Sequence, residues 1–263
     1  LLASVDSTNR FLKTQPHNSG LTLCASETQT NGRGRFARPW HSPLGEHIYC
    51  SLAWRFKGCP SNLSGLSLVV SLAVHAAIQQ LCPTRHLHDD HHTHTHIAIK
   101  WPNDLLWNHK KLAGILIEMT DATQGRTDVI IGIGLNVNAI QTNNTSITTP
   151  WCALCDIFKQ NIDRNTVLAH LITQLDQHLH IFSKQGFEIY RKQWQARDYL
   201  FGRTITVSNP HGQLTGQAQG VDDTGHLLLL DTQGVMHTLS SGDTSLAQKI
   251  VQAEKNKPFL NDG

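Results

Sequence analysis

Apolar and polar positions along the chain predict a mixed order of strands and helices. Short apolar runs bounded by Gly, Pro, Asn or Asp predict strands, and longer runs with apolar residues three or four apart predict helices. The strand-like runs are LLASVD, LTLCAS, IYCSLAW, IAIKW, DLLW, KLAGILIEM and DVIIGIGLNV. The last is the most apolar and is expected at the centre of a sheet, while DLLW and KLAGILIEM flank the turn NHK and predict a hairpin.

Helices are expected in four places. NRFLKTQ follows Ser7 and Thr8, either of which suits an N-cap, and LSGLSLVVSLAVHAAIQQL is predicted as a long helix, amphipathic or buried. Residues 164–183 and 187–199 carry the other two helical patterns.

The sequence pattern changes after Tyr199. RTITVS, LTGQAQGV, LLLLD and VMHTLS are short strand candidates, separated by turns at Asn209-Pro210, at residues 223–225 and at Gln233-Gly234. This spacing is typical of a small β-barrel. We therefore place a domain boundary near residue 200.

Composition narrows the class of protein. The chain has 263 residues, of which 39% are hydrophobic, and this is enough for a well-buried core. The formal net charge is only +2, so the whole surface gives no signal for nucleic acid or membrane. No apolar run reaches the roughly 20 residues that span a bilayer. We expect no membrane partner.

The cysteines and histidines suggest no fixed metal site. Six cysteines are scattered through apolar stretches and no secretory signal opens the chain, which favours reduced thiols in the cytoplasm. Cys152 and Cys155 form one CxxC pair without the second pair of a zinc site. Residues 86–96, HLHDDHHTHTH, hold six histidines, and we interpret them as a solvated insertion that binds metal adventitiously at most.

The stretch TQTNGRGRFARPWHS, residues 28–42, gathers positive charge on a flexible backbone. Glycine lets backbone N–H groups approach an anion, and arginine adds a planar fork of donors for phosphate or carboxylate. The Walker pattern GxxxxGK[ST] is absent. Taken alone, the stretch fits a phosphate cradle, a nucleic-acid contact or a solvated turn.

Two further stretches carry polar groups beside buried strands. In KWPNDLLWNHKKLAGILIE, Pro102 forces a bend, so Asn103 and Asp104 lie where a strand exits, and one of Lys110 and Lys111 begins the next strand. GIGLN lies within a strand and lacks the third glycine of a dinucleotide-binding turn. We expect its glycines, Gly132 and Gly134, to let a ligand or another strand pass close.

Together these stretches resemble the biotin protein ligases. The family pattern is an early DSTN, then Q-x-x-GRGR-x-x-R-x-W, KWPND, K-L-[AG]-G-I-L-x-E and G-x-G-x-N. Here the same order is DSTN, QTNGRGRFARPW, KWPND, KLAGILIE and GIGLN, and GDTSL at 242–246 looks like the end of the family's small barrel. The insertion at 86–96 departs from the pattern. The form that the chain resembles has no N-terminal DNA-binding domain, so we expect no DNA binding by this chain.

The resemblance implies an α+β fold and a two-step reaction. A catalytic domain over 1–199, with a mixed sheet flanked by helices of the class II synthetase type, would precede an SH3-like barrel over 200–250 and a tail over 251–263. The enzyme would join biotin to ATP as biotinyl-AMP, with Mg²⁺ as the metal, and pass biotin to a lysine of a biotin carboxyl carrier protein of acetyl-CoA carboxylase. A homodimer is a further expectation.

The resemblance also assigns roles to residues. Lys111, Arg33 and Arg35 would be catalytic, with Lys111 between the biotin carboxylate and the α-phosphate. The residues implied in biotin binding are Ser7, Thr8, Asn9, Gln29, Gly32, Arg33, Gly34, Arg35, Lys111, Gly114 and Gly132. Those implied in nucleotide binding are Arg35, Arg38, Trp40, Asn103, Asp104, Asn136 and Trp151, with Asp104 also as a Mg²⁺ ligand.

Three other functions are weighed against this one. A lipoate–protein ligase shares the chemistry, but GRGR and KWPND fit biotin better. A biotin-sensing regulator without catalysis would not need Lys111 and Asp104, both of which are present. A nucleic-acid binder is disfavoured by the near-neutral charge and the lack of interleaved aromatic and basic residues.

Overall fold

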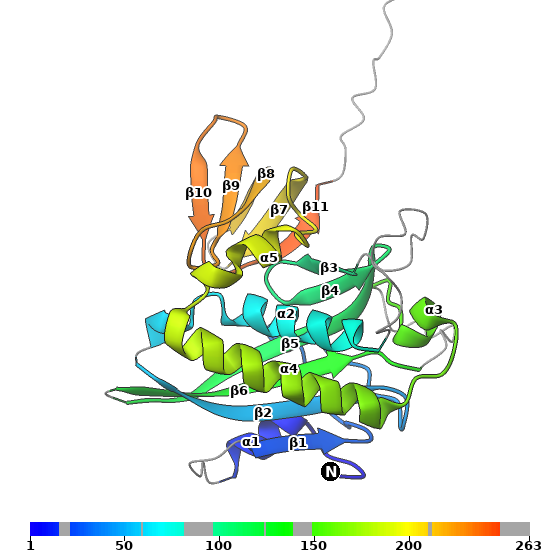
Figure 1. Ribbon diagram of the computed structural model, residues 1–263. Helices are drawn as coiled ribbons and strands as arrows, with labels where there is room; N and C mark the ends of the chain where they lie inside the picture. The colour runs from blue at the N-terminus through cyan, green and yellow to red at the C-terminus, as the bar shows by residue number, and fades with distance from the viewer. Residues whose placement is uncertain are drawn as a thin grey trace, which may run out of the picture.

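The structure, a computed structural model, is described for residues 1–15, 22–58, 60–81, 97–123, 125–138, 149–209 and 212–247. Its main part is a six-stranded sheet in the order β1-β2-β6-β5-β4-β3 (Figure 1). The strands are β1 (Thr22–Ser26), β2 (Ile48–Lys57), β3 (Ile97–Lys100), β4 (Asp104–Trp107), β5 (Lys110–Thr123) and β6 (Arg126–Leu135).

Every ladder of this sheet is antiparallel, which corrects the expectation of a mixed sheet. Parallel pairing occurs between described residues only as isolated bridges, two of which join Leu2 to Ser26 and Val5 to Gln29. The prediction that the opening LLASVD forms a strand is therefore wrong. This segment contacts the edge of the sheet only at these two bridges. The α+β class itself is confirmed.

Two long helices cover one face of the sheet. They are α2 (Leu66–Gln79) and α4 (Arg164–Gln185), which pack on each other and on the strands (Figure 1). The Asp163 carboxylate caps α4 by accepting from the N–H groups of Asn165 and Thr166, and Gly186 ends it with φ of 70°. The apolar positions of α4 recur every three or four residues and are buried, as its pattern predicts.

Short elements complete this part of the chain. They are α1 (Thr8–Lys13), η1 (Arg35–Ala37), η2 (Pro60–Leu63), α3 (Leu154–Phe158), η3 (Glu188–Tyr190) and α5 (Arg191–Gln195). The single helix predicted over 187–199 is wrong, because η3 and α5 end at Gln195 and the chain then runs beside β3. The predicted hairpin is confirmed: Asn108 and His109 turn β4 into β5 with φ of 46° and 64°, as a type I′ turn requires.

A second, five-stranded antiparallel sheet follows in the order β10-β9-β8-β7-β11. Its strands are β7 (Thr204–Asn209), β8 (Gly212–Val221), β9 (Leu227–Asp231), β10 (Met236–Leu239) and β11 (Asp243–Leu246). The four strands expected after Tyr199 are present, and GDTSL supplies the fifth. The predicted insertion at 86–96 and the predicted tail at 251–263 lie outside the described residues.

Candidate active site

The face of the large sheet opposite α2 and α4 has a floor of glycines. Strand alternation and register place Gly114 of β5 beside Gly134 of β6, and Leu116 beside Gly132. An added Cβ at Gly132 would collide with the Asn9 side chain, and one at Gly134 would collide with the Trp40 ring. The groups that approach these glycines are side chains of the chain itself, so the predicted approach of another strand is wrong, and the approach of a ligand stays a prediction.

Lys111 lies at one end of this floor. Its Nζ is 2.7 Å from Asp104 Oδ1 and 5.3 Å from the centre of the Trp40 ring. The Trp40 Nε1 atom is buried and has no hydrogen-bond partner among the described residues. The Lys111 ammonium group, the face of the Trp40 ring and the unpaired Trp40 N–H thus lie close together. Gly114 leaves room for them, because a Cβ there would lie 3.2 Å from Lys111 Nζ.

The Arg/Gly stretch forms a closed loop above the floor. The Trp40 N–H donates to Gly32 O and the Gly34 N–H donates to Arg38 O, both at 2.8 Å. Gly32 is required here, because its Cβ would lie within 3 Å of Gln29 and Ser42 side-chain atoms. η1 forms the tip, where Phe36 is 57% exposed.

The tip of this loop contacts the second sheet. Arg35 Nη1 donates to Gly242 O at 2.9 Å, and Arg38 forms an ion pair with Asp243. Burial lowers the pKa of Arg35, while the carboxylates of Asp243 and Asp104 oppose this shift. The hydrogen bond to Asp243 raises the pKa of Arg38.

Lys100 belongs to the same charge cluster. Burial lowers the pKa of Lys100, and Asp104 and Asp243 oppose that shift. Four cations, Arg35, Arg38, Lys100 and Lys111, thus share two carboxylates, which leaves an excess of two positive charges. Such a cluster suits a phosphate-bearing anion.

A polar network holds the other end of the floor. The backbone N–H of Thr8 donates to Gln29 Oε1 at 2.9 Å, and the Thr8 hydroxyl donates to the same atom at 3.2 Å. Asn9 and Ser51 continue this network below α1. Motif reading did not single out Ser51; its only signal was the alternation of β2, which places it on the floor face.

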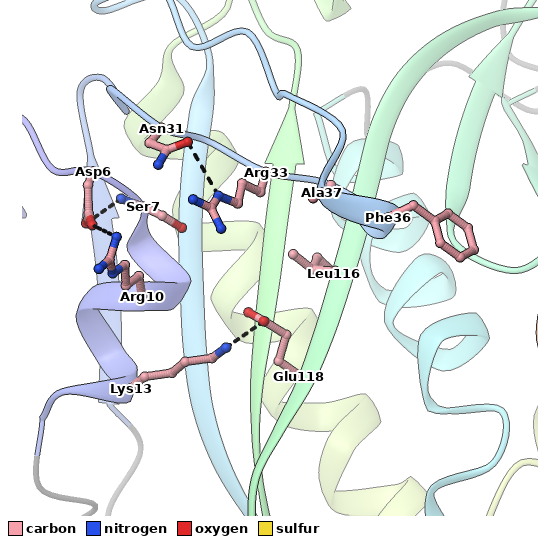
Figure 2. A pocket seen from close by; sticks show the side chains of 11 residues that line it. Asp6, Ser7, Arg10, Lys13, Asn31, Arg33, Phe36, Ala37, Leu116 and Glu118 are labelled. Carbon is pink, nitrogen blue, oxygen red and sulfur yellow. Dashed lines mark hydrogen bonds and ion pairs between the residues drawn. The ribbon is translucent and has the colours of Figure 1, made fainter.

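A pocket of about 450 Å³ opens beside this network (Figure 2). Its walls come from α1, the Arg/Gly loop and β5, and it bears both signs of charge. Arg10 pairs with Asp6 at 3.2 Å, Lys13 with Glu118 at 2.5 Å, and Arg33 Nε lies 3.4 Å from Asn31 Oδ1 (Figure 2). Of the predicted biotin-binding residues, Ser7, Arg33 and Gly34 line it.

Three predicted nucleotide-binding residues contact backbone. Asn103 Nδ2 donates to Ile115 O at 2.7 Å, and Asn136 Nδ2 donates to Cys152 O at 2.9 Å and to Lys111 O at 3.2 Å. Trp151 forms a bridge with Lys111, and its ring lies 5.8 Å from that of His47. In this structure their contacts hold the strands that carry Lys111 and Asp104.

The described ranges show neither a cluster of metal ligands nor a membrane-spanning helix. Those ranges contain no group of three or more His, Cys, Asp or Glu side chains that could hold a metal ion. No described helix is both long and apolar enough to cross a bilayer. The four described cysteines, Cys24, Cys50, Cys152 and Cys155, are free thiols.

Comparison with known proteins gives consistent matches. The model of the biotin/lipoate A/B protein ligase family matches residues 1–136, and that of the biotin protein ligase C-terminal domain matches residues 200–246. The bifunctional ligase/repressor BirA of Escherichia coli K12 is 32% identical over 248 residues, covering 94% of this chain and 73% of the relative. A biotin–[acetyl-CoA-carboxylase] ligase of Paracoccus denitrificans is 30% identical over 241 residues, covering 89% and 95%.

A solved structure resembles the whole described fold. It is the biotin protein ligase of Aquifex aeolicus in complex with biotin and ATP. The TM-score is 0.77 at 28% identity, and the match covers 94% of this chain and 97% of that one.

Proposed function

We infer the activity of this chain from the family to which it belongs, the biotin/lipoate A/B protein ligases, and within that family from the biotin protein ligases. The chain is an ATP-dependent biotin protein ligase. It forms biotinyl-AMP from biotin and ATP and then transfers the biotinyl group to a lysine of an acceptor protein. We propose a biotin carboxyl carrier protein of acetyl-CoA carboxylase as that acceptor, in line with the names of the relatives.

One observation carries the proposal for the site. Five motif stretches, which begin at residue 6 and end at residue 136, meet at one face of one sheet. There Lys111 lies 2.7 Å from Asp104 and over the Trp40 ring, and Arg35 and Arg38 contribute to the same charge cluster. This arrangement presents cations to an anion. These charged groups do not include a nucleophile beside a base, and the reaction does not need one because both reacting groups belong to the substrates.

In the first step the biotin carboxylate attacks the α-phosphorus of ATP. A P–O bond forms, the bond to pyrophosphate breaks, and biotinyl-AMP results. Charge accumulates on the phosphoryl oxygens, and we propose that Lys111 and Arg35 stabilise it. Asp104 holds the Lys111 ammonium by its ion pair, so the cation is oriented before the substrates arrive.

In the second step the amine of an acceptor lysine attacks the acyl carbon of biotinyl-AMP, and AMP leaves. The mixed anhydride must be kept from water until then. We propose that the loop 32–40 covers it, with Arg33 and Arg35 over the biotin carboxylate and phosphate. Arg38, Trp40 and Trp151 would contact the nucleotide.

The donors present suit Mg²⁺ that arrives with ATP. Mg²⁺ commonly takes one or two carboxylates and completes its shell with phosphate oxygens and water. Asp104 is a carboxylate in the charge cluster, and the described ranges hold no cage of several acidic side chains. When bound, the ion would neutralise phosphate charge and polarise the α-phosphoryl group.

We further propose a cytoplasmic enzyme, supported by the use of ATP and by the four described free thiols. A homodimer remains part of the proposal. DNA binding by this chain is not part of it, and its near-neutral net charge of +2 supports that view.

The test is incubation of the protein with ATP, Mg²⁺ and either biotin or lipoate, followed by measurement of pyrophosphate. We expect pyrophosphate to be released with biotin and not with lipoate. When the acceptor is added, we expect biotin to be attached to a lysine of the carrier protein. Release with lipoate alone would establish the lipoate ligase instead. Biotin binding without pyrophosphate release would indicate a regulator.

A further inference from the structure

We propose that Lys100 is a further catalytic residue, whose ammonium group binds the pyrophosphate leaving group while biotinyl-AMP forms. The proposal rests on the proposed function, because it takes ATP as the substrate and places the α-phosphate at Lys111. Lys100 is the last residue of β3, the strand at one edge of the large sheet (Figure 1). Within the motif KWPND, Asn103 and Asp104 have assigned roles and Lys100 has none.

The alternation of β3 places the Lys100 side chain on the face of the site. Ile97 and Ile99 are buried in the core on the helix side of the sheet, at 7% and 0% exposure. Successive side chains of a strand point to opposite faces, so Lys100 points away from that core. It is half-buried there, on the face that also carries the glycine floor.

Strand register places Lys100 in one row with that floor. Lys100 is paired with Asp104 of β4, and Asp104 is paired with Gly114 of β5. Gly114 is paired in turn with Gly134 of β6. Directly opposite residues of an antiparallel pair share a face, so the row runs straight across the site. Because neighbouring strands lie about 4.8 Å apart, the backbone of Lys100 lies roughly 10 Å from that of Gly114.

Lys100 also differs from the other three cations of the charge cluster. Each of those already has a partner, which is a carboxylate for Arg38 and for Lys111 and a backbone carbonyl for Arg35. Lys100 Nζ has neither a hydrogen bond nor an ion pair to any residue that the structure describes. The three donors of its ammonium group are therefore available to an anionic ligand.

The direction of the displacement points the pyrophosphate toward Lys100. A Cβ on Gly114 would lie 3.2 Å from Lys111 Nζ, so this ammonium stands over Gly114. The network of Thr8 and Gln29, proposed to hold biotin, lies at the start of α1, which packs on β1, β2 and β6. The attacking and leaving oxygens of a phosphoryl transfer lie roughly in line on opposite sides of the phosphorus. The carboxylate thus arrives from the side of β6, and pyrophosphate leaves toward β4 and β3.

The two lysines therefore act on different parts of ATP. When the carboxylate oxygen bonds to the α-phosphorus, the bond to the bridging oxygen breaks and its electron pair goes to pyrophosphate. Lys100 stabilises that developing charge, while Lys111 stays with the α-phosphoryl oxygens. In the second step AMP leaves and no pyrophosphate is present. A change at Lys100 should therefore affect the first step and spare the second.

The experiment compares Lys100→Met with the wild type in three assays. The first measures pyrophosphate release from biotin, ATP and Mg²⁺. The second is the reverse reaction, in which pyrophosphate attacks the α-phosphorus of synthetic biotinyl-AMP and yields ATP and biotin. The third measures transfer of biotin from synthetic biotinyl-AMP to the carrier protein. The rate of the first should fall and KM for pyrophosphate in the second should rise, each roughly tenfold or more, and transfer should be unchanged.

Lys110→Met is the matched control. Lys110 carries the same charge and lies on β5 beside Lys111, but its side chain is exposed. All three assays should match the wild type in this variant. A merely structural role of Lys100 would lower transfer together with the other two activities, because biotinyl-AMP and the acceptor need the same folded site.

Lys100→Gln decides the matter if Lys100→Met does not fold, because its polar amide tolerates the half-exposed position. The same division between the assays is expected. Unchanged kinetics with pyrophosphate, or an equal loss in transfer, in a folded variant would overturn the proposal. A wild type that releases no pyrophosphate with biotin and ATP would instead overturn the proposed function.

Discussion

At the scale of single residues, the site depends on charged side chains with defined partners. Lys111 is held by Asp104, and Arg35 by a backbone carbonyl of the second sheet. The neighbouring Lys110 also lies on β5, but its side chain is exposed and it is not one of the four cations of the charge cluster. Two neighbouring lysines thus have different surroundings, and they provide a direct test of which one acts.

Lys111→Ala should lower the rate of pyrophosphate release at least roughly tenfold. The change removes a charged hydrogen bond at the reacting centre, and such losses cost about 1.5–3 kcal/mol or more. The rate is measured with biotin, ATP and Mg²⁺ at saturation. Lys110→Ala is the control and should retain most of the activity. A wild-type rate in Lys111→Ala would exclude the proposed role.

Arg35→Gly should release biotinyl-AMP before transfer. The substitution removes the guanidinium and its bond to Gly242, so the loop 32–40 loses a contact that keeps it over the site. Adenylate formation can continue with Lys111 and Mg²⁺. The measurement is biotin attached to a bystander protein such as serum albumin, per pyrophosphate released. The ratio should rise above that of the wild type, and an equal ratio would show that Arg35 does not retain the intermediate.

At the scale of elements, two features matter: the glycine floor of β5 and β6, and the segment beside β3. On β5, alternate residues face opposite sides, so Gly114 faces the site while Ile115 is buried in the core. Beside β3, the Ile99 N–H donates to Arg197 O and the Tyr199 N–H donates to Ile99 O. Each feature allows one substitution whose effect can be read on its own.

Gly114→Ala should reduce adenylate formation and leave the fold in place. The new methyl group would lie 2.9 Å from the Trp40 ring and 3.1 Å from Lys111 Cε, so it displaces the ammonium from its position. A loss of about tenfold or more in the rate is expected from a small misplacement of a catalytic group. Ile115→Val is the control on the core face; it should lower stability by about 0.5–1.5 kcal/mol and keep the rate.

Asp198→Asn should stabilise the protein at neutral pH. Burial raises the pKa of Asp198 to about 6, and its Oδ2 is buried without a partner among the described residues. The folded state therefore holds a proton that the unfolded state has already lost above its own pKa, and stability falls as the pH rises from about 4 to about 6. The neutral amide avoids this loss, which is on the order of 3 kcal/mol for the shift from 3.8 to about 6.

Denaturant unfolding at pH 4 and pH 7.5 checks this prediction. The gain from Asp198→Asn should be present at pH 7.5 and much smaller at pH 4, where the wild-type carboxyl is protonated in the folded state. An equal effect at both values would mean that the charge of Asp198 is not the cause.

At the scale of the whole molecule, the second sheet is joined to the first part of the chain at several points. Trp101 Nε1 donates to Gly225 O at 3.1 Å, and Thr244 Oγ1 donates to Trp101 O at 2.9 Å. Trp101 is the residue that precedes Pro102, Asn103 and Asp104. The sheet that carries Asp243 is thereby fixed relative to the segment that carries Asp104, and both carboxylates contribute to one charge cluster.

Asp243→Asn should change retention of the intermediate more than stability. Its ion pair with Arg38 is largely exposed, and such pairs contribute about 1 kcal/mol or less to folding. Without it, the loop 32–40 loses a contact with the second sheet, and labelling of bystander albumin per pyrophosphate should increase. Asp223→Asn is the control, because Asp223 pairs with Arg191 at 2.5 Å away from that loop.

A double variant separates the direct and indirect effects. If Asp243 acts through Arg38, the double variant Arg38→Gln with Asp243→Asn should label albumin no more than the stronger single variant does. Additive effects would show that Asp243 acts on the site independently of Arg38.

The sequence by itself determined most strands, both long helices, the hairpin at 108–109 and the motifs of the site. Those signals are local: apolar periodicity, turn residues and motif spacing lie within short windows of the chain. The direction of strand pairing was not local in this sense, and the mixed sheet and the opening strand were wrong for that reason. A strand pattern records which face is buried, and it does not record which neighbour the strand pairs with.

Tertiary structure alone decided which side chains meet. Gly114, Gly132 and Gly134 form one floor because β5 and β6 pair in one register, and a shift of one residue would place them on the other face. The Ser51 hydroxyl donates to Thr8 Oγ1, and Asp243 pairs with Arg38, across separations of 43 and 205 residues. Such contacts depend on the packing of whole elements, because the local sequence around each residue does not predict which distant residue it contacts.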